Sequence, residues 1–594
     1  MELLGGFLEQ VRETLSHADS GTLSYVTMVF RFILPLLAII IVTRCIRSLL
    51  SEKSEAESWG YLIMPNMARI SLNHWENVIG RAKTSDVYME YPTLSRSHAA
   101  VIRDDKGNWR VYDVESKTGV IVNGVKISGA AGAAIKTRDV IELGGVELVF
   151  VAADETSEYE QAAQRTRPGK VFKQRTTLLF VTEFQLLLGL QLCISKGSAL
   201  TAALPLSFMA LITLMWLCYV LTRAMRRVSF EIETIAFFLC SIGMSVTASS
   251  SPVELYRQVL LLALGIGLFF ALGWFLRDLD RAKKMRPPIA TAGLMLLAVN
   301  LLFGRTVYGA RNWLVIAGIS FQPAEFVKIA FILAGAATLE RLFARRNLIV
   351  FVGFTGVCLI ALALINDFGM ALVFFVTYLI IAFLRSGDFA TILLSVGGAG
   401  FAGFLALRFR SHIAGRFATW GRAWEFANAA GYQQTRAMAA AASGGLLGVG
   451  AGRGWLTRVF AADTDLVFAM MCEELGLITA LAAILAILAF AVFSERSAET
   501  SRSSFYVIGA CAASAMLVFQ MLLNVLGSMD ILPFTGVTFP FISKGGSSLI
   551  SCWGLLAFIK AADTRQNASF IVKTPKRTGS KHSANGELTA YEKS

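Results

Sequence analysis

The stretch ADTDLVFAMMCEELGLITALAAILAILAFAVF, residues 462–493, places two aspartates ahead of a long apolar run and two glutamates within it. A mostly apolar run longer than about 20 residues is typical of a membrane-spanning helix. An ionised carboxylate in hydrocarbon is costly unless it is paired or hydrated, so each acid in such a run is a candidate functional group. The fold class and the function of the chain therefore both depend on this segment.

The two pairs of acids call for different explanations. Asp463 and Asp465 stand at the predicted N-terminus of the helix, where the helix dipole favours negative charge, but capping alone requires only one acid. Glu473 and Glu474 lie about 12 Å deeper at a rise of about 1.5 Å per residue. They point to different faces of the helix, so at least one needs a partner inside the protein. Buried structural hydrogen bonding is the preferred interpretation of this second pair.

The composition indicates that much of the chain lies in a bilayer. Of 594 residues, 55% are hydrophobic and 16% are charged, and the mean hydropathy is +0.58. Runs of mostly apolar residues, each about 17 to 25 long, predict about 13 spans. They are 25–43, 176–194, 203–222, 230–249, 254–276, 288–304, 322–340, 347–365, 366–384, 389–407, 466–493, 503–524 and 546–562. The predicted fold class is a polytopic α-helical membrane protein with a small all-β sandwich after the first span.

The net charge of +13 does not indicate nucleic-acid binding, because the Lys and Arg residues fall mostly in short clusters in every second connection between apolar runs. That pattern follows the positive-inside rule. It predicts an N-terminus outside the cell and a cytoplasmic polar domain and tail. The outer segments are then 305–321, 408–465 and 525–545. The second of these is expected to turn back into the protein and line a cavity.

The chain divides into a membrane anchor at 1–50, a polar insert, a linker at 152–175, a helical membrane domain at 176–562 and a disordered basic tail at 563–594. In the insert, SHAAVIRDDKGNWRVYDV (97–114) alternates apolar and polar residues on both sides of a glycine turn, which predicts a hairpin. GVIVNGVKI and VIELGGVELVF repeat this pattern. Such short strands separated by turns predict an all-β sandwich.

Three motifs of the insert occur in the order found in the forkhead-associated (FHA) domain. They are IGR (79–81), LSRSHA (94–99) and KTGVIVNG (117–124). The insert therefore resembles an FHA domain over residues 75–151. This resemblance implies that the loops at one end of the sandwich bind phosphothreonine.

Carried over to this sequence, the resemblance assigns roles to five side chains. Arg81 would pair with the phosphate and Ser95 would donate a hydroxyl hydrogen bond. Lys117 and Thr118 would flank the peptide, while His98 would brace the loop from behind. A guanidinium and neutral donors suit a phosphate dianion. Thr118 stands where Asn is usual and offers one donor in place of an amide's donor and acceptor, so a sandwich used only as a docking surface is the alternative.

Two further sites place charge within apolar runs. Glu325 and Lys328 lie at i and i+3 in QPAEFVK, on one face of a predicted helix. The pair alone is also compatible with an ion pair that only neutralises itself. Asp367 stands at the outer start of another span, and an N-cap explains it equally well.

Six ordered motifs resemble the SEDS family of bacterial membrane glycosyltransferases, which act in cell elongation, division and sporulation. They are GARNW, QPAEFVK, NDFGMALV, GYQQTRAMAAAASGGLLGVGAGRG, DTDLVFAMMCEELG and ILPFTGVTFPFISKGGSS. The resemblance covers residues 288–562 and does not separate these three roles. The chain departs from the family at Asn312, where Arg is usual, at Asn366, where Pro is usual, and at Lys544, where Tyr is common.

The resemblance implies that the chain polymerises lipid II. A sugar hydroxyl of one lipid II attacks the anomeric carbon of another and expels undecaprenyl pyrophosphate. Such a transfer needs a base for the hydroxyl proton and positive charge for the leaving group. Asp465 would be the base, and Asp463 would tune or cap it.

The charge for the pyrophosphate would come from Lys328, Arg311 and Arg305, with Glu325 holding Lys328 in place. Trp313 offers a flat apolar face for a sugar or for the first isoprenes of the lipid, and a tryptophan of the membrane interface is the alternative interpretation. A divalent cation such as Mg²⁺ or Mn²⁺ beside the base is an alternative source of charge. The residues that would bind such a metal are unknown from the sequence.

The resemblances also imply partners and a location. The partners are lipid II, a class B penicillin-binding protein acting as transpeptidase, and a phosphothreonine protein or Ser/Thr kinase substrate on the FHA domain. The location is the bacterial cytoplasmic membrane, with the FHA domain inside. Two other functions remain open, a lipid-linked precursor transporter (flippase) and an inactive scaffold, the latter suggested by Asn312.

Overall fold

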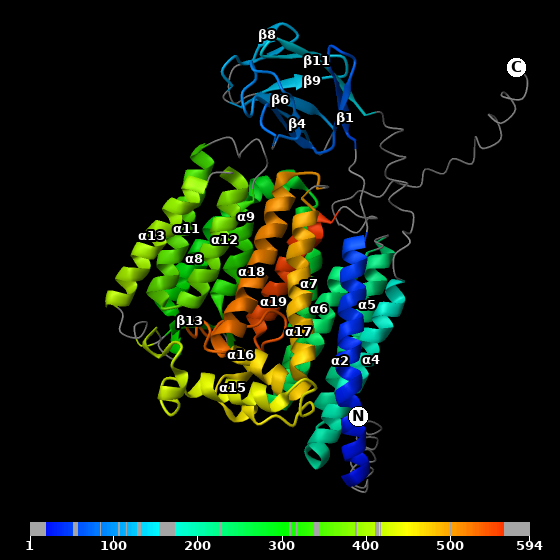
Figure 1. The fold of residues 1–594 in the computed structure, drawn as a ribbon, viewed down its shortest axis with the longest axis vertical. Helices are drawn as coiled ribbons and strands as arrows, with labels where there is room; N and C mark the ends of the chain where they lie inside the picture. The colour runs from blue at the N-terminus through cyan, green and yellow to red at the C-terminus, as the bar shows by residue number, and fades with distance from the viewer. Residues whose placement is uncertain are drawn as a thin grey trace, which may run out of the picture.

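The chain forms a bundle of long helices with a β-sandwich at one end of the bundle (Figure 1). The computed structural model describes residues 20–51, 58–83, 85–104, 107–114, 116–127, 132–153, 173–225, 229–307, 310–316, 318–336, 345–386, 389–409, 415, 417–498 and 501–563. Apart from their end residues, the predicted linker 152–175 and tail 563–594 lie outside the described residues.

Each predicted span overlaps a helix. The helices are α2 (Ser20–Ser51), α4 (Gln174–Lys196), α5 (Ala203–Ala224), α6 (Glu231–Ser250), α7 (Leu255–Leu276), α8 (Leu279–Phe303), α9 (Pro323–Gly335), α11 (Arg345–Ile365), α12 (Phe368–Ser386), α13 (Phe389–Phe409), α17 (Val467–Arg496), α18 (Ser504–Ser528) and α19 (Gly546–Ala562). Within the described residues, 10 helices are long and apolar enough to cross a membrane. The chain is therefore a multi-pass membrane protein.

Helix α8 begins well before the predicted span at 288–304. Asp278 caps it, because its carboxylate accepts a hydrogen bond from the Arg281 backbone N–H at 2.9 Å. The polar first turns of α8 are therefore helical although their hydropathy is low. Hydropathy located the apolar part of this helix and missed its start.

The central helix of the bundle is α6. Its apolar window is 100% buried inside the protein, whereas every other candidate span leaves part of its surface exposed. A Cβ atom at Gly243 would lie 2.8 Å from the carbonyl oxygens of Phe541 and Ile542. The absence of a side chain at Gly243 thus lets the segment before α19 pack directly on α6.

Helix α17 is broken at Gly476, contrary to the continuous span predicted at 466–493. Gly476 has φ 86° and ψ 160°, which L residues with side chains rarely adopt. Beside the break, the Val449 N–H donates to the Glu473 carbonyl at 2.8 Å. The glycine-rich segment 443–454 therefore pairs with backbone groups that the helix leaves open. This confirms that the predicted outer loop turns back into the protein, while its cavity-lining role stays a prediction.

The β-sandwich has two sheets. Their orders are β2-β1-β11-β10-β7-β8 and β4-β3-β5-β6-β9. The strands are β1 (Gly60–Ile63), β2 (Arg69–Leu72), β3 (Glu76–Gly80), β4 (Val87–Tyr88), β5 (Ala99–Arg103), β6 (Trp109–Asp113), β7 (Val120–Val122), β8 (Val125–Lys126), β9 (Ala133–Ile135), β10 (Val140–Leu143) and β11 (Val146–Ala152). The sandwich therefore extends N-terminal to the predicted 75–151, because β1 pairs with β11 and carries β2 on its other edge.

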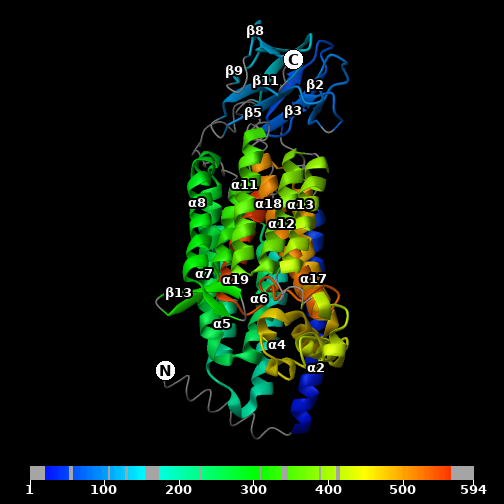
Figure 2. The ribbon, with the colours of Figure 1, turned by 90° about the vertical axis from the view of Figure 1, so that its left-hand side faces the viewer.

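The three segments predicted on the outer face share the end of the bundle opposite the sandwich (Figures 1 and 2). One of them is a small antiparallel sheet rather than a plain loop. Its strands are β12 (Arg305–Val307), β13 (Ala310–Ile316) and β14 (Ile319–Phe321). Another carries the helices α15 (Tyr432–Gly444) and α16 (Ala462–Asp465).

Candidate active site

The acidic segment, residues 462–465, forms the short helix α16. Hydrogen bonds to the backbone carbonyl groups of its last three residues hold it in place. The Lys544 N–H donates to the Asp463 carbonyl at 2.8 Å. The Ser543 hydroxyl donates to the Thr464 carbonyl at 2.7 Å. The Asn524 amide donates to the Asp465 carbonyl at 3.0 Å. Two separate parts of the chain thus fix the backbone that presents Asp465.

Asp465 itself is partly exposed, unlike residues 466–476, which follow it and are buried. Gly536 adopts φ +67°, and a Cβ atom there would lie 3.2 Å from Asp465 Oδ2. The carboxylate therefore lies against the backbone of the segment between α18 and α19. The predicted role of Asp465 as a base at an outward-facing opening stays a prediction.

Asp463 forms an ion pair with a lysine that sequence reasoning treated only as a departure. Lys544 Nζ lies 3.2 Å from Asp463 Oδ2 and 3.4 Å from Glu254 Oε1. The Ser250 hydroxyl donates to Asp463 Oδ2 at 2.9 Å. The Lys544 side chain keeps 21% of its surface exposed. A cation thus binds the acid two residues before Asp465, in a place that solvent reaches.

Glu473 and Glu474 are buried and accept hydrogen bonds, as predicted for structural acids. Glu473 accepts from the N–H groups of Trp455 at 2.8 Å and Leu456 at 3.1 Å. Glu474 accepts from the Gly452 N–H at 2.9 Å and from the Ser249 hydroxyl at 2.7 Å. Both carboxylates therefore anchor the re-entrant segment to α17.

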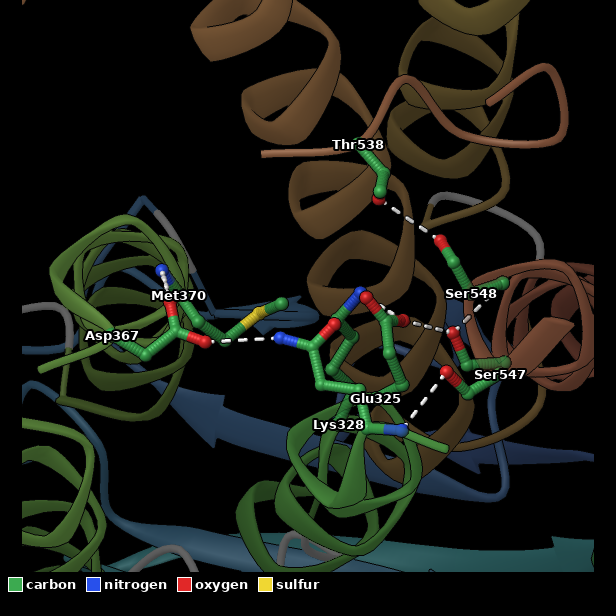
Figure 3. Close-up of polar contacts among 9 residues, drawn as sticks. Glu325, Lys328, Asp367, Met370, Thr538, Ser547 and Ser548 are labelled. Atoms are coloured by element: carbon green, nitrogen blue, oxygen red, sulfur yellow. Dashed lines mark hydrogen bonds and ion pairs between the residues drawn. The ribbon is translucent and has the colours of Figure 1, made fainter. Parts of the chain in front are cut away.

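Glu325 and Lys328 form a closed pair in α9 (Figure 3). Lys328 Nζ lies 2.6 Å from Glu325 Oε2, and both side chains are 0% exposed. The Ser551 hydroxyl of α19 also donates to Glu325 Oε2, at 2.6 Å. In this conformation the ammonium group cannot contact a ligand, so the geometry does not support the predicted direct contact between Lys328 and pyrophosphate.

Asp367, just before α12, both caps that helix and binds the neighbouring β-sheet segment (Figure 3). Its Oδ1 accepts from the Met370 N–H at 3.1 Å, and its Oδ2 accepts from the side-chain amides of Gln322 at 3.0 Å and Asn312 at 3.3 Å. Burial raises the pKa of Asp367 above its ordinary value, and these hydrogen bonds oppose that shift. The departure at Asn312 therefore supplies a hydrogen bond to a half-buried acid.

The other predicted residues of this region lie on the small sheet. Arg311 is exposed and donates to the Leu301 carbonyl at 3.1 Å. Trp313 is partly exposed and pairs across the sheet with Arg305. Their roles toward a pyrophosphate or a sugar stay predictions.

The start of α19 and the segment that precedes it connect this region with α16. The Gln322 N–H donates to the Ser547 hydroxyl at 3.2 Å, and the Ser548 hydroxyl lies 3.0 Å from that of Thr538 (Figure 3). One residue earlier, the Val537 carbonyl accepts from Asn524 at 2.8 Å. The N-terminus of α9 and the acidic segment are thus linked through hydrogen bonds to the same part of the chain, residues 537–548 and Asn524.

No group of three or more His, Cys, Asp or Glu side chains that could hold a metal ion occurs among the described residues. The nearest acid to Asp465 in sequence, Asp463, is already bound to Lys544. A divalent cation at Asp465 would therefore rely on fewer than three such side chains from this part of the chain.

The predicted phosphothreonine residues converge on three loops at one end of the sandwich. The Arg81 N–H donates to the Ser95 carbonyl at 3.1 Å, and the Lys117 N–H donates to the Ser95 hydroxyl at 3.1 Å. Buried His98 braces them, with Nδ1 accepting from the Ser95 N–H at 3.1 Å. Arg81, Lys117 and Thr118 are exposed. The structure thus brings the predicted residues together with three of their side chains exposed, while their role toward phosphothreonine stays a prediction.

Two family models match the chain. One, described as cell cycle protein and covering FtsW, RodA and SpoVE, matches residues 221–568, which is more than half of the chain. The other, the FHA domain, matches residues 77–144.

Individual proteins of the family that matches residues 221–568 are also similar to this chain. The peptidoglycan glycosyltransferase RodA of Mycobacterium tuberculosis is 29% identical over 325 residues, covering 51% of this chain and 69% of its own. A probable peptidoglycan glycosyltransferase FtsW of Nitrosococcus halophilus is 32% identical, covering 52% of this chain and 82% of its own. The crystal structure of RodA from Thermus thermophilus is 25% identical, covers 56% of this chain and 95% of its own, and has a TM-score of 0.40.

Proposed function

This chain belongs to the FtsW/RodA/SpoVE (SEDS) family and carries an FHA domain, and we therefore propose that it is a peptidoglycan glycosyltransferase that polymerises lipid II. The observation that carries the proposal is the placement of Asp465. Its backbone is held by three hydrogen bonds at 463–465, and its side chain is partly exposed at the end of the bundle opposite the sandwich. A fixed, accessible carboxylate is what a general base requires.

In the proposed reaction, a sugar hydroxyl of one lipid II attacks the anomeric carbon of a second. The new glycosidic C–O bond forms as the C–O bond to undecaprenyl pyrophosphate breaks. Asp465 takes the hydroxyl proton, and the pyrophosphate leaves with the bonding electrons. Because negative charge grows on the leaving group, a nearby cation stabilises the transition state.

Lys544 is the cation that the geometry favours for that role. Its ammonium group lies beside the acidic segment and is partly exposed, whereas that of Lys328 is sealed in its pair. The neighbouring Asp463 and Glu254 hold the ammonium in place. Arg311 on the exposed sheet is the second candidate, and Trp313 is the candidate surface for the sugar or isoprenes.

Lys544→Met should lower the polymerisation rate on the order of 10²-fold, the loss typical for removing one donor that stabilises developing charge. Lys544→Arg keeps the charge and should retain much of the rate. Initial rates with lipid II, measured with both variants, check this. Equal rates for the Met variant and the parent would remove Lys544 from the mechanism.

The sandwich is proposed to bind a phosphothreonine protein on the cytoplasmic side. Arg81→Ala should weaken binding of a phosphothreonine peptide roughly 10- to 100-fold, since a hydrogen bond to a charged group contributes about 1.5–3 kcal/mol. Fluorescence polarisation with the full-length protein in detergent, using the unphosphorylated peptide as control, measures the change. Unaltered binding by Arg81→Ala would contradict the phosphate role.

The proposed setting is the bacterial cytoplasmic membrane, with α16 at the outer face and the FHA domain in the cytoplasm. A class B penicillin-binding protein is the proposed partner, because glycan strands made at the outer face must then be crosslinked. The two other functions make different predictions. A flippase would move lipid II across vesicles without forming chains, and an inactive scaffold would do neither.

Purified protein in liposomes with lipid II tests the proposal directly. Glycan chains should form without any partner protein. Transport of lipid II across the vesicle membrane without chain formation would favour the transporter.

A further inference from the structure

The sandwich contacts the membrane domain at the start of α18. We call this contact the dock; it joins Trp59 and residues 74–76 of the sandwich to residues 501–504. The Trp75 N–H donates to the Arg502 carbonyl at 2.8 Å, and His74 Nδ1 lies 2.7 Å from the Ser501 carbonyl oxygen. These contacts join regions more than 400 residues apart in the chain. They place the end of the sandwich at which β3 begins directly on the connection from α17 to α18.

A cation–π cluster fastens this dock. Arg502 Cζ lies 5.0 Å from the Trp59 ring centroid and 5.4 Å from that of Trp75. Arg502 is 8% exposed. A guanidinium over aromatic rings is attracted by their π electrons, and more strongly when it is desolvated. The two tryptophans belong to the sandwich, so the cluster joins the two domains.

The sandwich also caps α18. Glu76 is 7% exposed and accepts hydrogen bonds from the Ser504 N–H at 3.1 Å and from the Ser504 hydroxyl. Ser504 is the first residue of α18. A carboxylate at a helix N-terminus satisfies an open N–H and interacts favourably with the helix dipole. An acid of the FHA domain therefore stabilises the first turn of a membrane-spanning helix.

The far end of the same helix holds the candidate base. Asn524 of α18 donates to the carbonyls of Asp465 at 3.0 Å and Val537 at 2.8 Å. At about 1.5 Å per residue, Ser504 and Asn524 are separated by about 30 Å along the helix axis. A single rigid element therefore runs from the dock to the segment that presents Asp465.

The predicted phosphothreonine-binding loops stay accessible while the sandwich contacts α18. The dock uses Trp75 and Glu76 at the start of β3, whereas Arg81 follows the end of that strand. The neighbouring antiparallel strand β5 runs the other way, and His98 precedes its start. The ligand end and the dock thus lie at opposite ends of two paired strands, so a phosphopeptide can bind without displacing Arg502.

We propose that the docked sandwich positions α18, and through Asn524 the Asp465 segment, so that undocking lowers the rate of lipid II polymerisation. Glu76 and Arg502 are then positioning residues that act on the reaction through α18. The part of the inference that concerns rate rests on the proposed function. The part that concerns the position of α18 does not.

The test uses full-length Arg502→Ala and Glu76→Gln, with Arg110→Ala as the matched control. Arg110 is an exposed arginine on strand β6 outside the dock. Hydrogen exchange is followed by mass spectrometry over the first turns of α18 and over residues 535–546. Lipid II polymerisation is measured on the same preparations.

Both dock variants should exchange faster in the two segments and polymerise several-fold more slowly, while Arg110→Ala matches the parent in both. Unchanged exchange at 535–546 in the dock variants overturns the positioning claim. Faster exchange at 535–546 with an unchanged polymerisation rate overturns the claim that undocking slows polymerisation. If the parent itself makes no glycan, the proposed function fails, and the exchange arm alone decides whether the dock positions α18.

Discussion

Asp465→Asn should reduce lipid II polymerisation about 10²- to 10⁴-fold, the range that general-base catalysis contributes. The amide has almost the same shape as the carboxylate but cannot take a proton from an attacking hydroxyl. The hydrogen bonds that hold the segment use main-chain carbonyls of residues 463–465, which the substitution leaves intact. The loss should therefore appear in the rate and not in the folding of the protein.

Initial rates and thermal unfolding of the purified variant check this expectation together. Glu425→Gln is the matched control, because Glu425 is an exposed acid in the segment between α13 and α15. It should keep the parental rate and melting temperature. Parental activity in Asp465→Asn would exclude Asp465 as the base.

Glu325→Ala should destabilise the protein by about 3–5 kcal/mol, because it leaves the Lys328 ammonium buried without its carboxylate. Both side chains are fully buried and in direct contact, so the remaining charge would have no access to water. A loss of that size is a large part of the stability of a typical protein, about 5–15 kcal/mol. Thermal unfolding in detergent and the yield of monodisperse protein measure it.

Two further variants separate the loss of the Glu325–Lys328 ion pair from other causes of lower stability. Glu325→Leu combined with Lys328→Met removes both charges at similar volume and should recover most of the lost stability. Arg257→Ala breaks an exposed i,i+3 pair with Glu254, at 3.9 Å, and should cost no more than about 1 kcal/mol. A double variant as unstable as Glu325→Ala would show that the pair has a role beyond mutual neutralisation.

The helical bundle and the FHA sandwich were predictable because their signals are local. Hydropathy runs locate spans since lipid requires a minimum apolar length, and period-two alternation locates strands. The hydrogen-bonding role of Glu473 and Glu474 also followed from their depth in an apolar run. The break at Gly476 did not, because a glycine inside such a run has no effect on hydropathy that would distinguish a kink from a straight helix.

The candidate site was predicted only in part, because ion pairs between distant segments are not visible along the chain. The sequence paired Glu325 with Lys328 but could not tell that the pair is sealed. Lys544 appeared only as a departure from the family pattern, and its contact with Asp463 depends on how two loops meet. The cation–π contact of Arg502 with Trp59 and Trp75 joins segments that carry no shared motif.

The proposed mechanism requires the Asp465 side chain to open to water at the outer face of the membrane. Labelling of the Asp465→Cys variant in intact cells with a membrane-impermeant maleimide tests it most directly. The parent provides the background, since its described cysteines are buried or partly buried, and Asn123→Cys on the exposed surface of the sandwich reports access from the cytoplasm. The Asp465→Cys variant should react in intact cells, while the Asn123→Cys variant should react only after permeabilisation. Reaction of the Asp465→Cys variant only after permeabilisation, or no reaction at all, would contradict an accessible carboxylate at the outer face.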